Sequence, residues 1–432
     1  MRFFRVARQN VQTVVDEIAS SRKPIDVYVD YVRKIVEDVK TRGDEALMEY
    51  ARRFDSSRLT IEDILVPRKR LAEAYNQLDD RARKALRKAA ENISKLCSSQ
   101  LRRLSFVRNL EQGVKVVLRP APLHSVGCYV PGGLASYPST ALMTVVPAKV
   151  AGVPRVVVCT PPASEGLLND AVLAALYVAG ADEVYAVGGP HAVAAMAYGT
   201  ETVRRVEKIV GPGGPYVTAA KKVVSGDVPV DMLAGPTELL VFGDDVRDAE
   251  DIALEMCAQA EHSEDTLVGL ATTSDELANE VMKYVKLIAS RLERREDHRE
   301  LAEKNGYVAV CDSLTTVVEL VQSLAPEHFF ITSKPDKIAP YVSNAGLMSV
   351  GRYTSPALCD YVVGVNHVLP TSGQARVRGG LSVLDYVKLA TEVRVLKGAA
   401  KRLGRHAAVL ARAEGLTAHA AAAGRLLDEK HG

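Results

Sequence analysis

The chain has 432 residues, of which 47% are hydrophobic and 25% are charged, as in soluble globular proteins. This length predicts roughly two to four domains. Lys and Arg number 55 against 53 Asp and Glu, so the net charge of +2 implies neither a nucleic-acid nor a membrane partner.

Apolar runs and cysteines indicate a cytoplasmic protein. The longest apolar run, around Val153–Thr160, has the length of a strand and not of a membrane span. The first residues, MRFFRVARQN, lack the apolar segment of a signal peptide, so none is expected. The six cysteines are dispersed without a CxxC pair, which indicates small core residues in a reducing compartment.

The first 110 residues or so are predicted to be mainly helical. Residues 27–55 and 71–96 carry apolar residues at three- and four-residue spacing, and Gly43 is expected to break the first run. Between them, residues 63–67 (DILVP) are predicted to form a short strand.

From Val114 onward, strand and helix patterns alternate with short linkers, which predicts βαβ units on parallel sheets. Residues 228–245 are expected to be a linker between two such blocks, whose similar order suggests an internal duplication. The Ala-rich sequence from Val395 predicts two helices divided near Gly415. We therefore expect an α/β protein with two successive, incomplete Rossmann-like parallel-sheet domains, a helical N-terminal region and a helical C-terminal arm.

A polar pair closes one of the predicted helices. The run DAEDIALEMC is amphipathic and is expected to turn these residues toward a core: Ile252, Leu254, Met256 and Cys257. Gln259 and His262 follow three residues apart, so on a helix they share a face. An amide oxygen and an imidazole nitrogen can hold a divalent metal. The simpler interpretation is a polar helix end at which His262 interacts with the C-terminal end of the helix dipole.

Three glycine-rich turns follow predicted strands, at Val130–Gly133, Val187–His191 and Gly211–Tyr216. Such turns can direct backbone N–H groups and helix N-termini at an anion such as a pyrophosphate. None of them has the G-x-G-x-x-G spacing, and a tight turn without a ligand explains each one as well.

Paired polar residues occur later in the chain. Glu327 and His328 precede a predicted strand and could serve one site only if the backbone is irregular there, which Pro326 favours. Residues 355–371 are expected to form a loop at a strand's carboxyl end, the usual ligand side of an open α/β sheet. In that loop, Asp360 and His367 lie among apolar residues, which indicates burial with partners.

Several long motifs together resemble the histidinol dehydrogenase family in order and spacing over essentially the whole chain. They are CYVPGGLASYPSTALMTVVPAKVAGV, GPGGPYVTAAKK, VDMLAGPTELLV, CAQAEH, APEH, DYVVGVNHVLPTSGQAR, GLSVLDYVK and EGLTAH.

This resemblance implies oxidation of L-histidinol to L-histidine through a bound aldehyde, with two NAD and one water consumed. It implies one zinc ion per subunit that holds the substrate's imidazole and amino group, with Mn²⁺ or Co²⁺ as substitutes. Matched position by position, the implied metal ligands are Gln259, His262, Asp360 and, from the other subunit of a homodimer, His419.

The resemblance also implies the remaining roles. His328 would take the alcohol proton, and Glu327 would activate the water that attacks the aldehyde. Besides the metal ligands and His328, the implied substrate-binding residues are Thr237, His367 and Glu414. Without the resemblance, Glu414 and His419 would be interpreted only as solvated side chains of a surface helix.

For the cofactor, the resemblance implies that Tyr129, His191 and Gly214 contact NAD. The family usually has Gln at position 191, Asn at 214 and Gly at 359, whereas this chain has His191, Gly214 and Cys359. The substrate and zinc positions are retained while the cofactor positions differ, so NAD contacts are more in doubt than the substrate.

The expected division of the chain follows from these roles. It comprises an N-terminal helical segment (1–24), a first α/β domain carrying the metal and catalytic residues (25–112 and 232–385), a second α/β domain that binds NAD (113–231) and a helical dimerisation arm (386–432). Two alternatives stay open: a related zinc and NAD dehydrogenase of another polar alcohol, such as a sulfonated diol, and a non-catalytic zinc-binding paralogue.

Overall fold

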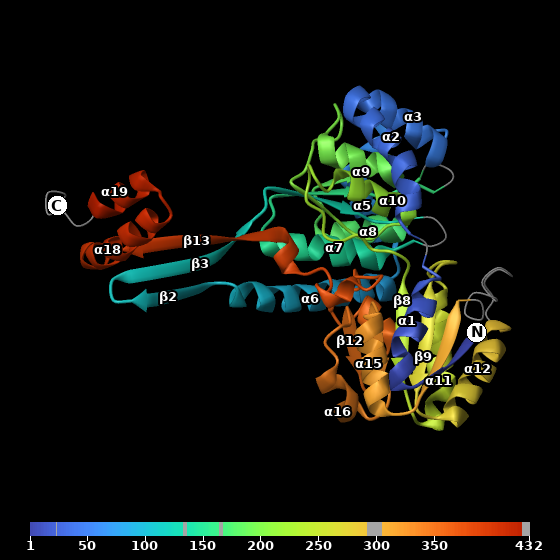
Figure 1. Cartoon of the computed structure of the whole chain (residues 1–432). Coiled ribbons are helices and arrows are strands. Elements are labelled where there is room, and N and C mark those ends of the chain that lie inside the picture. The colour runs from blue at the N-terminus through green and yellow to red at the C-terminus, as the bar shows by residue number, and fades with distance from the viewer. Residues whose placement is uncertain (23, 133–135, 164–166, 292–304, 426–432) are drawn as a thin grey trace. The chain divides into compact units, whose positions relative to one another are not determined.

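The computed structural model describes residues 1–22, 24–132, 136–163, 167–291 and 305–425 (Figure 1). The chain forms two compact units. The first unit contains Met1–Cys97 and Leu123–Tyr386, and the second contains Ser98–Pro122 and the residues from Val387 onward.

The larger sheet of the first unit, sheet A, has six parallel strands. In spatial order these are β1 (Arg2–Val6), β10 (Gly306–Cys311), β9 (Leu267–Thr272), β8 (Glu238–Phe242), β11 (His328–Ile331) and β12 (Leu347–Val350). The chain order reverses between β8 and β11, which is the switch point of a doubly wound fold.

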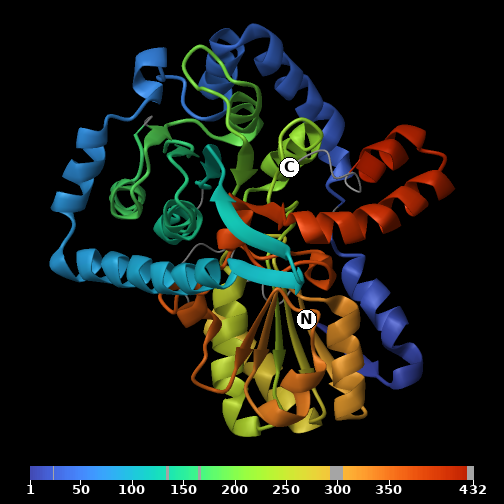
Figure 2. The same cartoon turned by 90° about the vertical axis from the view of Figure 1, so that its left-hand side faces the viewer.

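Helices cover both faces of sheet A, as Figure 2 shows. One face packs on α1 (Val11–Ala19) and α15 (Leu314–Leu324), and the other on α11 (Ala249–Ala260) and α12 (Asp275–Ala289). Burial on both faces explains why β8, β9 and β10 are continuous apolar runs instead of alternating ones.

A second parallel sheet, sheet B, has the spatial order β6 (Glu183–Tyr185), β5 (Arg155–Cys159), β4 (Ser125–Tyr129) and β7 (Lys208–Val210). Its switch point lies between β4 and β7. Its own connections are α7 (Pro138–Ala151), α8 (Asp170–Ala179), α9 (Gly189–Tyr198) and α10 (Pro215–Val224). The predicted α/β class with two parallel-sheet blocks is confirmed.

The N-terminal helices pack on the sheet B side of the unit. They are α2 (Asp26–Arg42), α3 (Asp44–Phe54), α4 (Ile61–Ile64) and α5 (Arg68–Gln77), and the long helix α6 (Asp80–Arg103) follows them in the chain. Apolar residues of α2 and α3 share a core with α9 and α10, and α5 packs on α8. Residues 25–112 are expected from the sequence to belong with sheet A, whereas the apolar faces of these helices are buried against sheet B's helices.

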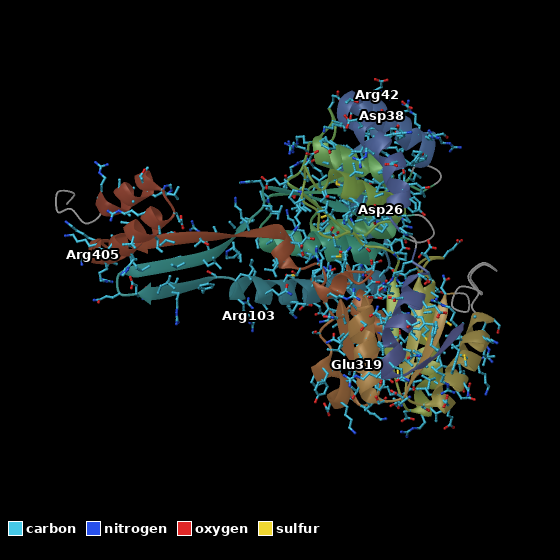
Figure 3. All side chains as sticks on the ribbon, in the orientation of Figure 1. Asp26, Asp38, Arg42, Arg103, Glu319 and Arg405 are labelled. Atoms are coloured by element: carbon cyan, nitrogen blue, oxygen red, sulfur yellow. The ribbon has the colours of Figure 1, made fainter. Side chains whose placement is uncertain are left out.

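Charge placement fits helix α2. Asp26 lies in its first turn and Lys40 and Arg42 in its last, which complements the helix dipole (Figure 3). Gly43 has φ 57 and separates α2 from α3, so the predicted break at Gly43 is confirmed.

Three element predictions fail. The predicted strand 63–67 is wrong: Thr60 and Asp63 cap the short helix α4, and Leu65 contributes only an isolated bridge to Tyr185. The predicted linker 228–245 contains β8, the central strand of the switch point. In the region predicted to be helical, β1 and β2 (Phe106–Glu111) are strands.

The second unit has its own antiparallel sheet, in the order β13 (Val387–Val395), β3 (Val114–Pro122) and β2. Strand β3 therefore departs from the predicted parallel domain over 113–231, because it pairs with the unpredicted strand β13. Helices α18 (Lys397–Ala413) and α19 (Thr417–Arg425) follow, separated at Gly415 (φ 76) as predicted.

The remaining short elements are η1 (Arg8–Asn10), η2 (Val246–Asp248), α16 (Pro335–Ile338), η3 (Ala339–Tyr341), α17 (Pro356–Tyr361), η4 (Gln374–Arg376) and η5 (Val383–Tyr386). Among the described residues, no helix has both the length and the apolar character needed to cross a membrane.

Candidate active site

Candidate residues gather at the amino edge of sheet A. Thr237 immediately precedes β8, Glu327 immediately precedes β11, and His328 is the first residue of β11. Helix α11 returns the chain from β8 to the start of β9, so its C-terminal residues reach the same edge. Residues 355–371 follow the carboxyl end of β12, as expected, but Ser372, directly after this segment, bonds to Glu238 at the start of β8, so the segment also reaches the amino edge, which was not expected.

Glu327 lies in irregular backbone just before the strand. This matters because adjacent residues of a regular strand point to opposite faces and could not both serve one site. Ala325 adopts left-handed φ of 47, and only from His328 does the chain enter the strand. The buried Glu327 carboxylate accepts a hydrogen bond from the main-chain N–H of Glu238 at 2.7 Å. Burial, together with the charges of Glu238 and Asp360, raises the pKa of Glu327 well above its ordinary value.

His328 is a buried base. Its Nε2 lies 2.8 Å from Oγ of Ser349 on the neighbouring strand β12, and Ser349 Oγ lies 3.5 Å from Cys359 Sγ. Burial lowers the pKa of His328 to about 4, so the imidazole is neutral at physiological pH. The nitrogen Nδ1 makes no hydrogen bond within the described part of the chain.

Gln259 and His262 are adjacent but do not share a helix, since α11 ends at Ala260. The turn beyond brings His262 Nδ1 to 3.1 Å from the Gln259 carbonyl oxygen. That oxygen can only accept, so Nδ1 carries the proton and Nε2 keeps its lone pair. Leu254 of the same helix is 51% exposed, against the prediction that it faces the core.

Asp360 lies on the short helix α17, so the segment predicted as a loop over 355–371 is partly helical. Helix α17 packs on α11, and Ser355 donates a hydrogen bond to Glu255 of that helix. Burial, and next the charge of Glu255, raise the pKa of the Asp360 carboxyl to about 7. A cation beside Asp360 would relieve this penalty.

His367 connects the two sheets. Its Nδ1 lies 2.8 Å from the main-chain oxygen of Asp360, and its Nε2 lies 3.1 Å from Oγ1 of Thr140 at the start of α7. Because the carbonyl accepts from Nδ1–H, Thr140 donates to Nε2. Burial lowers the pKa of His367 to about 4, so both contacts involve a neutral ring. The carboxyl edge of sheet B thus adjoins the amino edge of sheet A.

These contacts join most of the predicted site in one cluster. His367 bonds to the main-chain oxygen of Asp360. The pKa of His367 is lowered chiefly by burial, is raised by the Asp360 carbonyl and is lowered a little further by the nearby His262. The charge of Asp360 contributes to the raised pKa of Glu327. In the described ranges, no three His, Cys, Asp or Glu side chains gather as a metal cluster. The candidate donors here are the Gln259 amide oxygen, the His262 Nε2 nitrogen and the buried Asp360 carboxylate, which fit a zinc site that needs a further ligand.

The turn Gly211–Gly214 is firmly held. Gly211 has φ 112, and its main-chain N–H donates to Asp231 at 2.8 Å while its carbonyl oxygen accepts from Lys221 at 2.9 Å. A Cβ on Gly211 would lie 2.2 Å from the Tyr129 carbonyl oxygen, so only glycine fits. Gly214 is the N-cap residue before α10, and a Cβ there would meet nothing within 4 Å.

Tyr129 and His191 organise the neighbouring turn. Tyr129 accepts a hydrogen bond from Gly189 N–H at 3.0 Å, and Asp55 accepts one from Gly188 N–H at 3.0 Å. His191 Nε2 lies 2.9 Å from Asp55, and the ring is completely buried near Phe54. The N–H groups of both turn glycines are therefore already occupied.

Glu414 and His419 belong to the second unit. Glu414 is the C-cap residue of α18, and His419 lies in α19; both are exposed on that unit.

Sequence reasoning missed Ser349, Thr140, Asp55, Glu238 and Arg22. Glu238 stands beside Thr237 in one of the family motifs and Thr140 lies in another, which was a usable signal. Ser349, Asp55 and Arg22 are brought in by the tertiary fold, which no local pattern reveals.

Comparison with known proteins shows which family the chain matches. Residues 19–426 match the family model described as histidinol dehydrogenase. The histidinol dehydrogenase of Methanothermobacter thermautotrophicus is 42% identical over 417 residues, covering 96% of this chain and 97% of that protein. That of Methanopyrus kandleri is 45% identical, covering 90% and 92%. The crystal structure of histidinol dehydrogenase from Elizabethkingia anophelis matches with a TM-score of 0.91 at 30% identity, covering 99% and 98%.

Proposed function

The chain belongs to the histidinol dehydrogenase family of NAD-dependent oxidoreductases, and we propose that it oxidises L-histidinol to L-histidine through a bound aldehyde. The observation that carries the proposal is the buried pair Glu327 and His328 at an edge that also holds Gln259, His262 and Asp360. When bound, NAD accepts the hydride of each oxidation.

The two steps need different bases, and the pair supplies them. The neutral His328 ring takes the alcohol proton at Nδ1 when Nε2–H donates to Ser349. Glu327, oriented by the Glu238 N–H, takes a proton from the water that attacks the aldehyde.

NADH formation with L-histidinol tests the proposal on purified protein. Two NADH per histidine are expected. Turnover of another polar alcohol with none of histidinol supports the first alternative enzyme, and zinc binding without any turnover supports a non-catalytic protein.

We propose that zinc is held by Gln259, His262 and Asp360 together with His419 from the partner subunit. The free Nε2 of His262 and the carboxylate of Asp360 support this donor set. When bound, the ion would position the substrate's imidazole and amino group instead of generating hydroxide. Thr237 lies at the same edge, and Glu414 adds a substrate contact from the partner's second unit.

Zinc affinity should depend on pH through Asp360. Its carboxyl has a pKa of about 7, and only the ionised form binds a cation, so affinity is full above pH 7 and falls about tenfold per pH unit below it. Burial lowers the pKa of His262, which favours the neutral ring that a metal ligand needs. Competition with a chromophoric chelator between pH 5.5 and 8.5 measures this. Asp360→Asn should lose the dependence along with most of the affinity, and a flat profile for the unaltered protein would contradict the assignment.

We propose that NAD binds at the carboxyl edge of sheet B, where Tyr129 and the turn before α10 lie. Tyr129 accepts from Gly189, which leaves its own O–H to donate. Full burial of His191 supports a role in ordering the turn through Asp55, with the cofactor contact left to exposed neighbours.

Restoring the family's usual residue should strengthen cofactor binding. Gly214→Asn fits without strain, because the position is open and asparagine is a good first residue before a helix. We expect the Kd of NAD, measured by titration calorimetry, to fall severalfold. His191→Gln serves as the comparison: it breaks the Asp55 contact and should lower the free energy of unfolding without tightening NAD. Unchanged NAD affinity in Gly214→Asn would argue that position 214 does not face the cofactor.

We also propose a homodimer in the cytoplasm, with each active site completed by the partner's second unit. Glu414 and His419 are exposed on the second unit, so both side chains are accessible to a partner subunit, which supports this sharing.

A further inference from the structure

A buried ion pair involves Glu238, whose main-chain N–H bonds to Glu327. Arg22 Nε, from the segment after α1, lies 2.8 Å from Oε1 of Glu238, and the two side chains are 19% and 4% exposed. Glu238 is the first residue of β8, beside Thr237. A charge this deeply buried is costly unless it is paired, so Arg22 stabilises an ionised Glu238.

Glu238 and Glu327 hold each other through their main chains. The N–H of Glu238 donates to Glu327 Oε2 at 2.7 Å. Burial raises the pKa of Glu238, and that rise is opposed by Arg22 and by the main-chain N–H groups of Ser372 and Glu327. Ser372 N–H lies 3.1 Å from Glu238 Oε1. The carboxylate of Glu238 is thus fixed in place next to the general base.

The charges around the two carboxylates can be named. Glu238 faces Arg22, Glu327 and the hydroxyl of Tyr307, whose own pKa burial raises, so that it stays neutral. Glu327 faces Glu238 and Asp360. Arg22 is the cation that contacts this group directly, and it contacts Glu238 instead of the base.

We propose that Arg22 and Glu238 are positioning residues for the second oxidation: the Glu238 main chain orients the Glu327 carboxylate, and the Arg22-stabilised charge of Glu238 keeps that carboxylate a strong base. The proposal rests on the function proposed above, because it assigns Glu327 to the aldehyde step. A neighbouring negative charge disfavours ionisation of Glu327 and so increases its affinity for the water proton. His328 and the alcohol step do not depend on this pair.

Glu238→Gln tests the proposal, since the amide oxygen keeps the contacts to Ser372 and Arg22 and the main-chain N–H is unchanged. Histidinol oxidation and histidinaldehyde oxidation are measured separately across pH 5 to 9. We expect kcat of the aldehyde step to fall about three- to tenfold and its acidic limb to move about one unit lower, because a base without the neighbouring charge ionises at lower pH. The alcohol step should change less than twofold.

Arg22 provides the second arm. Arg22→Met removes the cation, so Glu238 takes up a proton and the acidic limb should shift as in Glu238→Gln, with no further shift in the double variant. Arg22→Lys should restore the original limb. Glu183→Gln is the matched control, because Glu183 forms a 2.8 Å ion pair with Arg155 in sheet B, away from the base; it should lower stability without moving the limb.

The outcomes separate the two proposals. Equal losses in both oxidation steps, or an unmoved acidic limb in Glu238→Gln, would overturn the positioning role. If Glu327→Gln itself leaves aldehyde oxidation intact, the assignment of Glu327 fails, and the proposed function fails with it.

Discussion

Glu327→Gln should lower aldehyde oxidation about a thousandfold, and His328→Ala should lower alcohol oxidation by a similar factor, because each removes a proposed general base of the reaction. Zinc content should stay unchanged in both variants, since neither side chain belongs to the proposed ligand set. In Glu327→Gln, the amide oxygen of the new side chain can still accept the Glu238 N–H, so the fold is expected to persist.

The measurements are NADH release from each substrate and metal analysis of the same protein samples. Glu319→Gln is a suitable control: Glu319 lies on the outer side of α15, in an exposed contact with Arg8, and should leave both rates intact (Figure 3). Loss of zinc in Glu327→Gln or His328→Ala would place that residue in the metal shell instead.

The pH dependence has a definite sign. Because the pKa of His328 is about 4, its ring is neutral and active above that pH, and it does not cause a loss of rate near pH 6. The raised pKa of Glu327 means that protonation stops the aldehyde step at a higher pH than the alcohol step. The acidic limb of the aldehyde step is therefore expected to follow Glu327, the proposed general base.

The sequence predicted the βα alternation well because each buried strand of sheets A and B is a run of apolar residues between helices of period 3.6. It failed where neighbours decide the structure. Strands β2 and β13 lie largely exposed, so neither carries the buried pattern, and β13 also pairs with β3 from a distant part of the chain, Val387 with Pro122 and Val395 with Val114. Strand β8 was missed because its five residues follow a mainly apolar stretch, residues 228–237, that contains Pro and Gly and has no strand or helix periodicity.

The structure brings several of the predicted site residues together, but their position at the amino edge of sheet A was not predicted. The irregular backbone before His328 followed from Pro326, whereas the amino-edge position followed from how α11 and α17 return along sheet A. His262 illustrates the difference: spacing alone placed it on the face of Gln259, but a turn after Ala260 and a bond to the Gln259 carbonyl set its tautomer. Such contacts depend on the tertiary fold.

A mixture of two inactive variants should regain activity if the site is shared between subunits. Asp360→Ala and His419→Ala each remove a proposed zinc ligand and should each lose at least about a hundredfold in rate. In a mixed dimer, one site combines the intact first unit of the His419→Ala chain with the intact second unit of the Asp360→Ala chain. Random exchange makes about half of the dimers mixed, each with one complete site, so about one quarter of the full activity should return.

The experiment mixes the purified variants, allows exchange and follows NADH formation from L-histidinol. Differently tagged chains show by copurification that mixed dimers have formed. His406→Ala is the matched control, because His406 is also an exposed histidine of the second unit but lies outside the motif EGLTAH; it should remain active alone. Proven exchange without any recovered activity would mean that each chain completes its own site, and His419 would then have to reach Asp360 within one subunit.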